Sequence, residues 1–111
     1  MLETRRHDAI RELRLARPPV NALDPALVRA LRDAIADAQR EGARGLVLSG
    51  RAGMFSAGLD VPVLLALSRE ALRVFWGDFF GLCADIACAP IPIVAAITGH
   101  APAGGAVLAI I

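Results

Sequence analysis

Lysine is absent from the 111-residue chain, so all 12 of its basic residues are arginines. A phosphate-binding Walker loop requires a lysine, and the sequence therefore excludes that class of nucleotide site. It also lacks the G-x-G-x-x-G fingerprint of dinucleotide-binding proteins. The chain also has 11 acidic residues, which leaves a net charge of +1. Such a balance offers no basic surface, and we expect no nucleic-acid partner.

Cysteine and histidine are scarce, with only two residues of each type. Cys83 and Cys88 lie five positions apart in a helical pattern, so they point to different faces and could not reach disulfide geometry. Neither histidine is near them in the sequence, and the spacing of a zinc site is missing. We therefore expect no metal site, both thiols packed in the core, and structural or surface roles for His7 and His100.

We also expect no secretory signal, because the N-terminus is charged from Glu3 onward and no apolar segment follows. The longest uncharged run, Ile86 to Ile111, is long enough to span a membrane. Prolines, glycines, Thr98 and His100 interrupt it, which favours strand, loop and helix start over one spanning helix. We expect a cytoplasmic protein with no membrane partner.

What the chain does have is enough apolar content to fold. Hydrophobic residues make up 56% of it and the mean hydropathy is +0.54, which excludes a disordered chain. A length of 111 residues allows one domain with a core of its own.

Hydrophobic periodicity divides the chain into alternating strands and helices. Asp24 is a good N-cap before Pro25, and an apolar stripe follows until Gly42. Short apolar runs between turn residues are typical of fully buried parallel strands, and together with the helices they predict an α/β fold. The expected elements are a hairpin or a pair of strands over 1–16 with a turn near His7-Asp8, a helix over 25–41, buried strands over 45–50 and 93–97, a helix over 68–88 with Ser68 as its N-cap, and the start of a helix at 106–111.

The helix expected over 68–88 carries most of the aromatic residues on one face. We predict that this face is core, with the alternative that one or two members also line a ligand pocket; it comprises Leu72, Phe75, Trp76, Phe79, Cys83, Ile86 and Ala87. Gly77 and Gly81 lie four residues apart, which would let another backbone approach closely. On its polar side, Glu70, Asp78 and Asp85 are interpreted as solvated charges.

A strand, a loop of small residues and a helix follow one another twice, at 45–60 and at 92–106. In an open parallel sheet, the loops at the carboxyl ends of neighbouring strands line one crevice. Small residues leave backbone N–H groups uncovered, and a helix N-terminus adds positive partial charge. Two such N–H groups could converge on one oxygen as an oxyanion hole. The alternative is two tight connections that need glycine for their geometry.

The residues of these loops resemble a known family. Phe55-Ser56-Ala57-Gly58-Leu59-Asp60, followed by Ile97-Thr98-Gly99-His100-Ala101-Pro102-Ala103-Gly104-Gly105, strongly resembles the crotonase, or enoyl-CoA hydratase/isomerase, superfamily. Pro18-Pro19-Val20-Asn21-Ala22-Leu23 and the order of elements match as well. The resemblance covers essentially the whole chain. It implies an α/β fold of repeated ββα units, with residues 1–111 as the N-terminal part of one crotonase-like domain.

Chains of this family are more than twice as long, with later ββα turns and a helical C-terminal region used for trimerisation. The resemblance therefore implies a homo-oligomer, a trimer or hexamer, for the full-length protein. Here the sequence stops at Ile111 inside an apolar element without a C-cap. We interpret it as a fragment of the fold.

The resemblance also implies the chemistry. Members bind acyl-CoA thioesters, in fatty acid metabolism, and hold the enolate oxygen with two backbone N–H groups, here those of Ala57 and Gly104. Asp60 would be a structural residue of its loop and of the following turn rather than a base. CoA is part of the substrate, so no separate cofactor is expected. The remaining substrate-binding positions would be Phe55, Ser56, Gly58, Leu59, Asp60 and Gly105.

The acid/base residues of the family decide its subtypes. Hydratases carry a glutamate at the position of Val107, and a valine cannot move a proton, so hydration is disfavoured. The loop from Ala101 to Gly105 looks like that of the Δ3,Δ2-enoyl-CoA isomerases, whose single glutamate comes from a later segment. One carboxylate suffices to move a proton from C2 to C4. Leu59 stands where some decarboxylating relatives carry histidine, which weakens that option.

Several functions stay open on these residues. The first is an enoyl-CoA isomerase of crotonase type, seen as its N-terminal portion. The second is a truncated, non-catalytic remnant that binds acyl-CoA or a partner chain, and the third is an enoyl-CoA hydratase. Dienoyl isomerisation and thioester hydrolysis also stay open, because the residues that distinguish them would lie beyond position 111.

Overall fold

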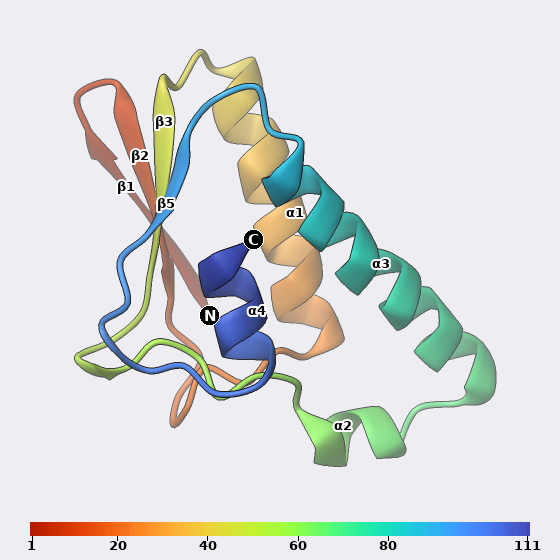
Figure 1. Cartoon of the computed structure of the whole chain (residues 1–111). Helices are drawn as coiled ribbons and strands as arrows, with labels where there is room; N and C mark the ends of the chain where they lie inside the picture. Colours follow the sequence, from red (N-terminus) through yellow and green to blue (C-terminus); the bar gives the residue numbers. More distant parts are fainter.

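The computed structural model describes all 111 residues, and its elements repeat a β-β-α order three times (Figure 1). The second unit carries two helices in place of one. The elements are β1 (Leu2–His7), β2 (Ile10–Leu15), α1 (Pro25–Arg40), β3 (Gly45–Ser49), β4 (Gly53–Met54), α2 (Val61–Leu65), α3 (Arg69–Ala87), β5 (Ile93–Ala95), β6 (Gly99–His100) and α4 (Gly104–Ile110). The predicted α/β fold of ββα units is confirmed.

The strands form two sheets. The main sheet has the order β1-β2-β3-β5, in which β1 and β2 are an antiparallel hairpin and β3 and β5 run parallel to β2. The second sheet pairs only β4 with β6, again in parallel. Because β3 and β5 are parallel neighbours, the loops that follow them emerge at the same edge of the main sheet. This places 51–60 and 96–105 next to each other.

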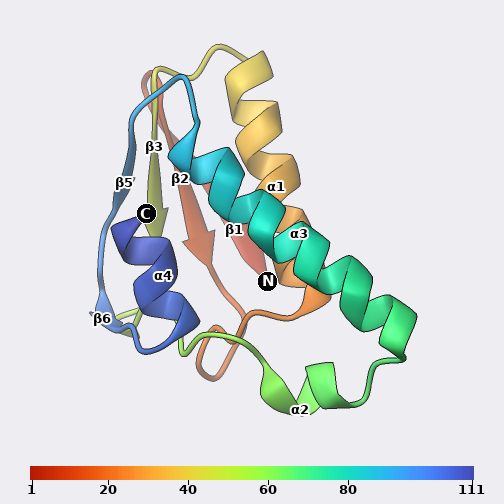
Figure 2. The ribbon, with the colours of Figure 1, turned by 45° about the vertical axis from the view of Figure 1, so that its right-hand side comes forward.

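The helices lie on one side of the main sheet (Figures 1 and 2). In Figure 2, α1 and α3 run side by side over it, and α4 packs near β5. The space between helices and sheet is filled by buried apolar side chains, among them Leu13, Leu15, Leu27, Leu31, Ile35, Leu46, Leu48, Phe75, Phe79 and Leu82. None of the helices combines the length and the apolarity that a membrane crossing requires.

Local signals in the sequence predicted the long elements correctly. The hairpin turns at Asp8, which takes a left-handed φ of 57°. The Asp24 carboxylate accepts a hydrogen bond from the Leu27 N–H at 2.8 Å, and the Ser68 hydroxyl accepts one from the Ala71 N–H at 3.1 Å. These caps begin α1 and α3 at the predicted residues, because a capping side chain acts only on the next turn of the chain.

Short elements were missed. Helix α2 was not predicted, and the residues of β4 and β6 were predicted to be loop. Each of these strands has two residues, too few to show a hydrophobic period. Helix α4 begins at Gly104, two residues before the predicted start at 106. Its first two residues are glycines, which carry no helical signal of their own.

Three predictions about burial are wrong. Cys88 is exposed, because α3 ends at Ala87 and the thiol lies beyond its packed face. Trp76 is 36% exposed, whereas Leu82 is fully buried, so the packed stripe of α3 is rotated from the predicted one. The strand expected to be buried over 93–97 ends at Ala95, and Val94 is 59% exposed. Strand β5 lies at the edge of the main sheet, so Val94 has a partner on one side only, which is Val47 of β3.

Charged side chains join α1 to α3. Arg32 donates from Nε to Asp85 Oδ2 at 2.8 Å, and its Nη1 lies 3.4 Å from Asp78 Oδ1. Arg29 donates to the other oxygen of Asp78 at 2.7 Å. The prediction that Asp78 and Asp85 are solvated charges is therefore wrong, since the two helices pair their polar faces. Sequence patterns within one helix carry no information about such a partner.

The two glycines of α3 have different surroundings. A Cβ atom built on Gly81 would lie 2.5 Å from the Arg32 guanidinium carbon, whereas one built on Gly77 would meet nothing within 4 Å. The close approach expected at these positions is thus made by a side chain, and only at Gly81. The missing Cβ at Gly81 leaves room for Arg32 to reach Asp85.

We predict opposite outcomes for alanine at these two positions. Gly77→Ala should raise the free energy of unfolding by about 0.5–1 kcal/mol, because alanine is the better helix former and the space is open. Gly81→Ala should gain less or lose stability, since its methyl group displaces the Arg32 guanidinium. Urea unfolding of both variants measures the difference. Equal gains would show that the Arg32 contacts contribute nothing.

Candidate functional site

Two loops that were predicted to share one crevice meet through backbone hydrogen bonds. Gly53 pairs with Gly99 and Met54 with His100 in the second sheet. The His100 carbonyl then accepts from the Phe55 N–H at 2.9 Å and from the Ser56 N–H at 3.3 Å. Residues 51–60 and 96–105 therefore form one continuous structure.

Glycine permits the closest approach between these loops. Gly58 has a left-handed φ of 93°, and a Cβ atom built on it would lie 2.7 Å from the Gly104 nitrogen. A Cβ atom on Gly105 would lie 2.1 Å from the Ser56 carbonyl oxygen. No side chain fits either gap, so both positions require glycine for the packing of backbone on backbone.

The two N–H groups singled out in the sequence differ in their hydrogen bonding. Gly104 is the first residue of α4, so its N–H has no partner inside the helix, and no loop carbonyl accepts from it. The Ala57 N–H donates to the Val20 carbonyl at 3.0 Å. The N–H of the next residue, Gly58, donates to the Ser56 hydroxyl at 3.1 Å. The structure thus leaves one of the two N–H groups free and pairs the other with a carbonyl.

The turn before Gly104 is strained. Ala103 has φ 49° and ψ −119°, a conformation that favours glycine, and the Gly105 N–H donates to the Pro102 carbonyl at 2.9 Å across this turn. The ψ angle of Ala103 sets the plane of the next peptide, and with it the direction of the Gly104 N–H. Strain of this kind costs on the order of 1–3 kcal/mol and is found most often at functional sites.

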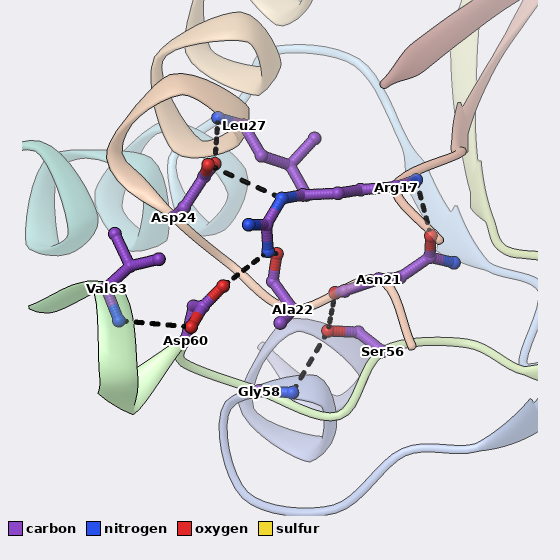
Figure 3. Close-up of polar contacts among 9 residues, drawn as sticks. All are labelled: Arg17, Asn21, Ala22, Asp24, Leu27, Ser56, Gly58, Asp60 and Val63. Carbon is purple, nitrogen blue, oxygen red and sulfur yellow. Dashed lines mark hydrogen bonds and ion pairs between the residues drawn. The ribbon is translucent and has the colours of Figure 1, made fainter. Parts of the chain in front are cut away.

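Residues 17–23 support the first loop from the other side. Asn21 is buried, and its side chain accepts from the Arg17 N–H at 2.8 Å and donates to the Phe55 carbonyl at 3.0 Å. The Ser56 hydroxyl donates to the Asn21 carbonyl at 2.8 Å (Figure 3). No role was predicted for Asn21 from the sequence. Its left-handed φ of 53° is a conformation that asparagine tolerates well, but only the structure shows its partners.

The predicted substrate-binding residues fall into separate places. Phe55 and Ser56 are fully buried, with the Phe55 side chain in the core. Gly58 and Gly105 lie in the contact between the loops. The other predicted residues of this loop line a cavity of about 360 Å³, whose walls are Arg17, Pro18, Pro19, Val20, Ala22, Ala57, Leu59, Asp60, Val61 and Pro62.

Asp60 is the only carboxylate that lines this cavity, and both of its oxygens are engaged (Figure 3). One oxygen lies 2.6 Å from Arg17 Nη1, and the other accepts from the Val63 N–H at 3.3 Å, which caps α2. The hydrogen bond from Arg17 lowers the pKa of Asp60 below its ordinary value. A carboxylate held in this way is a weak base.

A larger hollow of about 650 Å³ lies between α1 and α3 and contains none of the predicted site residues.

Comparison with known proteins gives the family. The sequence profile described as enoyl-CoA hydratase/isomerase matches residues 5–111. The chain is 35% identical over 108 residues to the peroxisomal bifunctional enzyme of Pongo abelii, covering 96% of this chain and 14% of that protein. This chain therefore belongs to the enoyl-CoA hydratase/isomerase family and has the crotonase fold.

Solved structures agree with this assignment. The human mitochondrial Δ3-Δ2-enoyl-CoA isomerase superposes with a TM-score of 0.90 at 27% identity, covering 97% of this chain and 43% of that one. A probable enoyl-CoA hydratase of Mycobacterium tuberculosis superposes with a TM-score of 0.86 at 34% identity, covering 95% and 44%. The chain thus spans less than half the length of these structures.

We predict that the contact between the loops does not tolerate a methyl group. Gly105→Ala should lower the free energy of unfolding by about 1–3 kcal/mol or more, because its Cβ would overlap the Ser56 carbonyl. Ala103→Gly removes a methyl group from the same turn and should be tolerated, since φ 49° favours glycine. Thermal unfolding of the two variants compares them. If Gly105→Ala were as stable as the original chain, the close approach would be wrong.

Proposed function

We propose that this chain binds the thioester of an acyl-CoA where the two loops meet, and that the backbone N–H groups of Ala57 and Gly104 hold the thioester oxygen as an oxyanion hole. The single observation that carries the proposal is the unpartnered N–H of Gly104 beside the loop of Ala57 and Gly58. The cavity lined by Ala57 and Leu59 offers space for the ligand. Family membership supports the substrate class.

The hydrogen bond from Ala57 to Val20 has a consequence for this proposal. A substrate carbonyl must replace the Val20 carbonyl as the acceptor, which exchanges one neutral acceptor for another. The exchange becomes favourable when the thioester oxygen gains negative charge, because charged acceptors bind N–H donors about twice as strongly. The Ala57 N–H would then act mainly on the enolate, and an interaction stronger in the transition state than in the ground state accelerates the reaction.

We propose double-bond isomerisation rather than hydration as the reaction. Val107 lies in α4 at the position where hydratases of this family carry a glutamate, and a valine side chain can move no proton. Asp60 is a poor base because Arg17 holds its pKa low. The carboxylate that isomerisation needs would therefore come from a segment outside these 111 residues or from another chain. A homo-oligomer and a cytoplasmic location stay predictions, and the relatives named above include a peroxisomal enzyme.

Binding can be tested with amide resonances of the chain. We expect octanoyl-CoA to shift the Gly104 and Ala57 amide proton signals strongly, because the thioester oxygen becomes their acceptor. Free CoA lacks that carbonyl and is the matched control, which should leave the Gly104 signal near its original position. Equal shifts with both ligands would place the thioester elsewhere. No shift with either ligand would overturn the proposed binding.

The reaction is tested with two substrates and with protein purified from its own source, whose intact mass is measured first. We expect conversion of a 3-enoyl-CoA to the 2-enoyl-CoA and no formation of 3-hydroxyacyl-CoA from the 2-enoyl-CoA. Hydration at a comparable rate would favour the hydratase. A mass of 11.6 kDa together with binding but no turnover would favour the non-catalytic remnant.

A further inference from the structure

We propose that Arg17 is a positioning residue, which joins the N-caps of α1 and α2 and thereby holds the loop of Ala57 and Asp60 in place for the ligand. This inference rests on the proposed function for the identity of the ligand. Its geometry is independent of that function. Figure 3 shows the guanidinium between the two capping carboxylates.

Each capping carboxylate divides its oxygens between a helix and Arg17. Asp24 accepts from the Leu27 N–H at 2.8 Å with Oδ1, and its Oδ2 lies 3.4 Å from Arg17 Nε. Asp60 caps α2 through Val63 with Oδ1, and its Oδ2 lies 2.6 Å from Arg17 Nη1. Both caps thus use the same cation, although they begin helices in different ββα units.

The guanidinium also holds the backbone between the caps. Its Nη1 donates to the Ala22 carbonyl at 3.0 Å. The next residue, Leu23, donates to the Gly58 carbonyl at 2.7 Å and accepts from the Asp60 N–H at 2.9 Å. Arg17 therefore closes a ring of contacts around the segment that presents Ala57. Its planar fork is suited to several acceptors at fixed angles, which a lysine cannot contact together.

Partial burial strengthens the ion pairs of Arg17. The side chains of Arg17, Asp24 and Asp60 are 25%, 15% and 14% exposed, so the three charges are poorly hydrated compared with those of the exposed pair Arg73–Glu70. Without the arginine, two carboxylates that had shared a cation would repel each other across the loop. The loop would then move away from α1, and Ala57 would move with it. The contacts that Arg32 makes between α1 and α3 do not involve Arg17.

The test uses Arg17→Gln in the full chain, with Arg73→Gln as the matched control for the loss of one positive charge. Far-UV circular dichroism establishes that each variant is folded. Hydrogen exchange of the Ala57 amide, which donates to Val20, reports the position of the loop. We expect it to exchange at least about tenfold faster in Arg17→Gln, with unchanged exchange at Leu31 in the core of α1. Unchanged Ala57 exchange would overturn the proposal.

Ligand affinity separates positioning from direct contact. We expect Arg17→Gln to weaken octanoyl-CoA about tenfold while free CoA changes much less, since only the thioester depends on the Ala57 N–H. Equal loss for both ligands would mean that Arg17 contacts the CoA moiety itself, which overturns a purely positioning role. If the original chain binds neither ligand, the proposed function fails, whereas the exchange of Ala57 still decides the role of Arg17.

A second substitution checks the physical cause. Asparagine is an equally good N-cap, so Arg17→Gln combined with Asp24→Asn removes the repulsion but keeps α1 capped. The double variant should recover most of the slow Ala57 exchange. The pKa of Asp60, read from its carboxyl carbon shift, should rise in Arg17→Gln and fall back in the double variant. Absence of recovery would show that charge repulsion is not the cause. Should Arg17→Gln fail to fold, Arg17→Lys tests the geometry of the contacts alone, because it keeps the positive charge but cannot contact all the acceptors together. The Ala57 amide should then exchange faster than in the original chain, and unchanged exchange would overturn the proposal.

Discussion

The contact of backbone on backbone between Gly58 and Gly104 is the constraint on which the rest of the site depends. The Gly104 nitrogen fills the space where Gly58 would carry a Cβ atom. Parallel pairing of β3 with β5 brings the loops to one edge of the sheet, and the pairing of β4 with β6 sets their register. The absence of a side chain at Gly58, and likewise at Gly105, then lets peptide groups from separate ββα units lie side by side.

This arrangement is stabilised from outside the contact. The turn at Ala103 is strained and the Gly104 N–H has no partner, both of which disfavour the folded state locally. Asn21, Ser56 and Arg17 supply hydrogen bonds that hold the first loop against residues 17–23. The larger part of the apolar core lies elsewhere, between the main sheet and the layer of α1 and α3. The site can therefore carry strain because a separate core supports it.

Much of the fold could be predicted because its signals are local. Asp24 and Ser68 act on the turn that follows them, and the alternation around Leu13 reflects one buried face of a strand. The errors concern partners distant in sequence. Asp78 looks solvated within its own helix, yet it pairs with Arg29 across the helix layer. Trp76 and Leu82 both fit an apolar stripe, and only packing against α1 and the sheet decides that Leu82 is the buried one.

By itself the sequence determined the α/β class, the caps, the two loops of small residues and the likeness to one family, because each of these is encoded in residue type and spacing along a short stretch. Tertiary structure decided which backbone groups in the loops are free. Gly104 keeps an unpaired N–H, whereas Ala57 donates to Val20, and Asp60 is bound by Arg17. A hydrogen bond needs its acceptor at a defined distance and angle, and here the acceptors arrive from segments that meet only after the chain has folded.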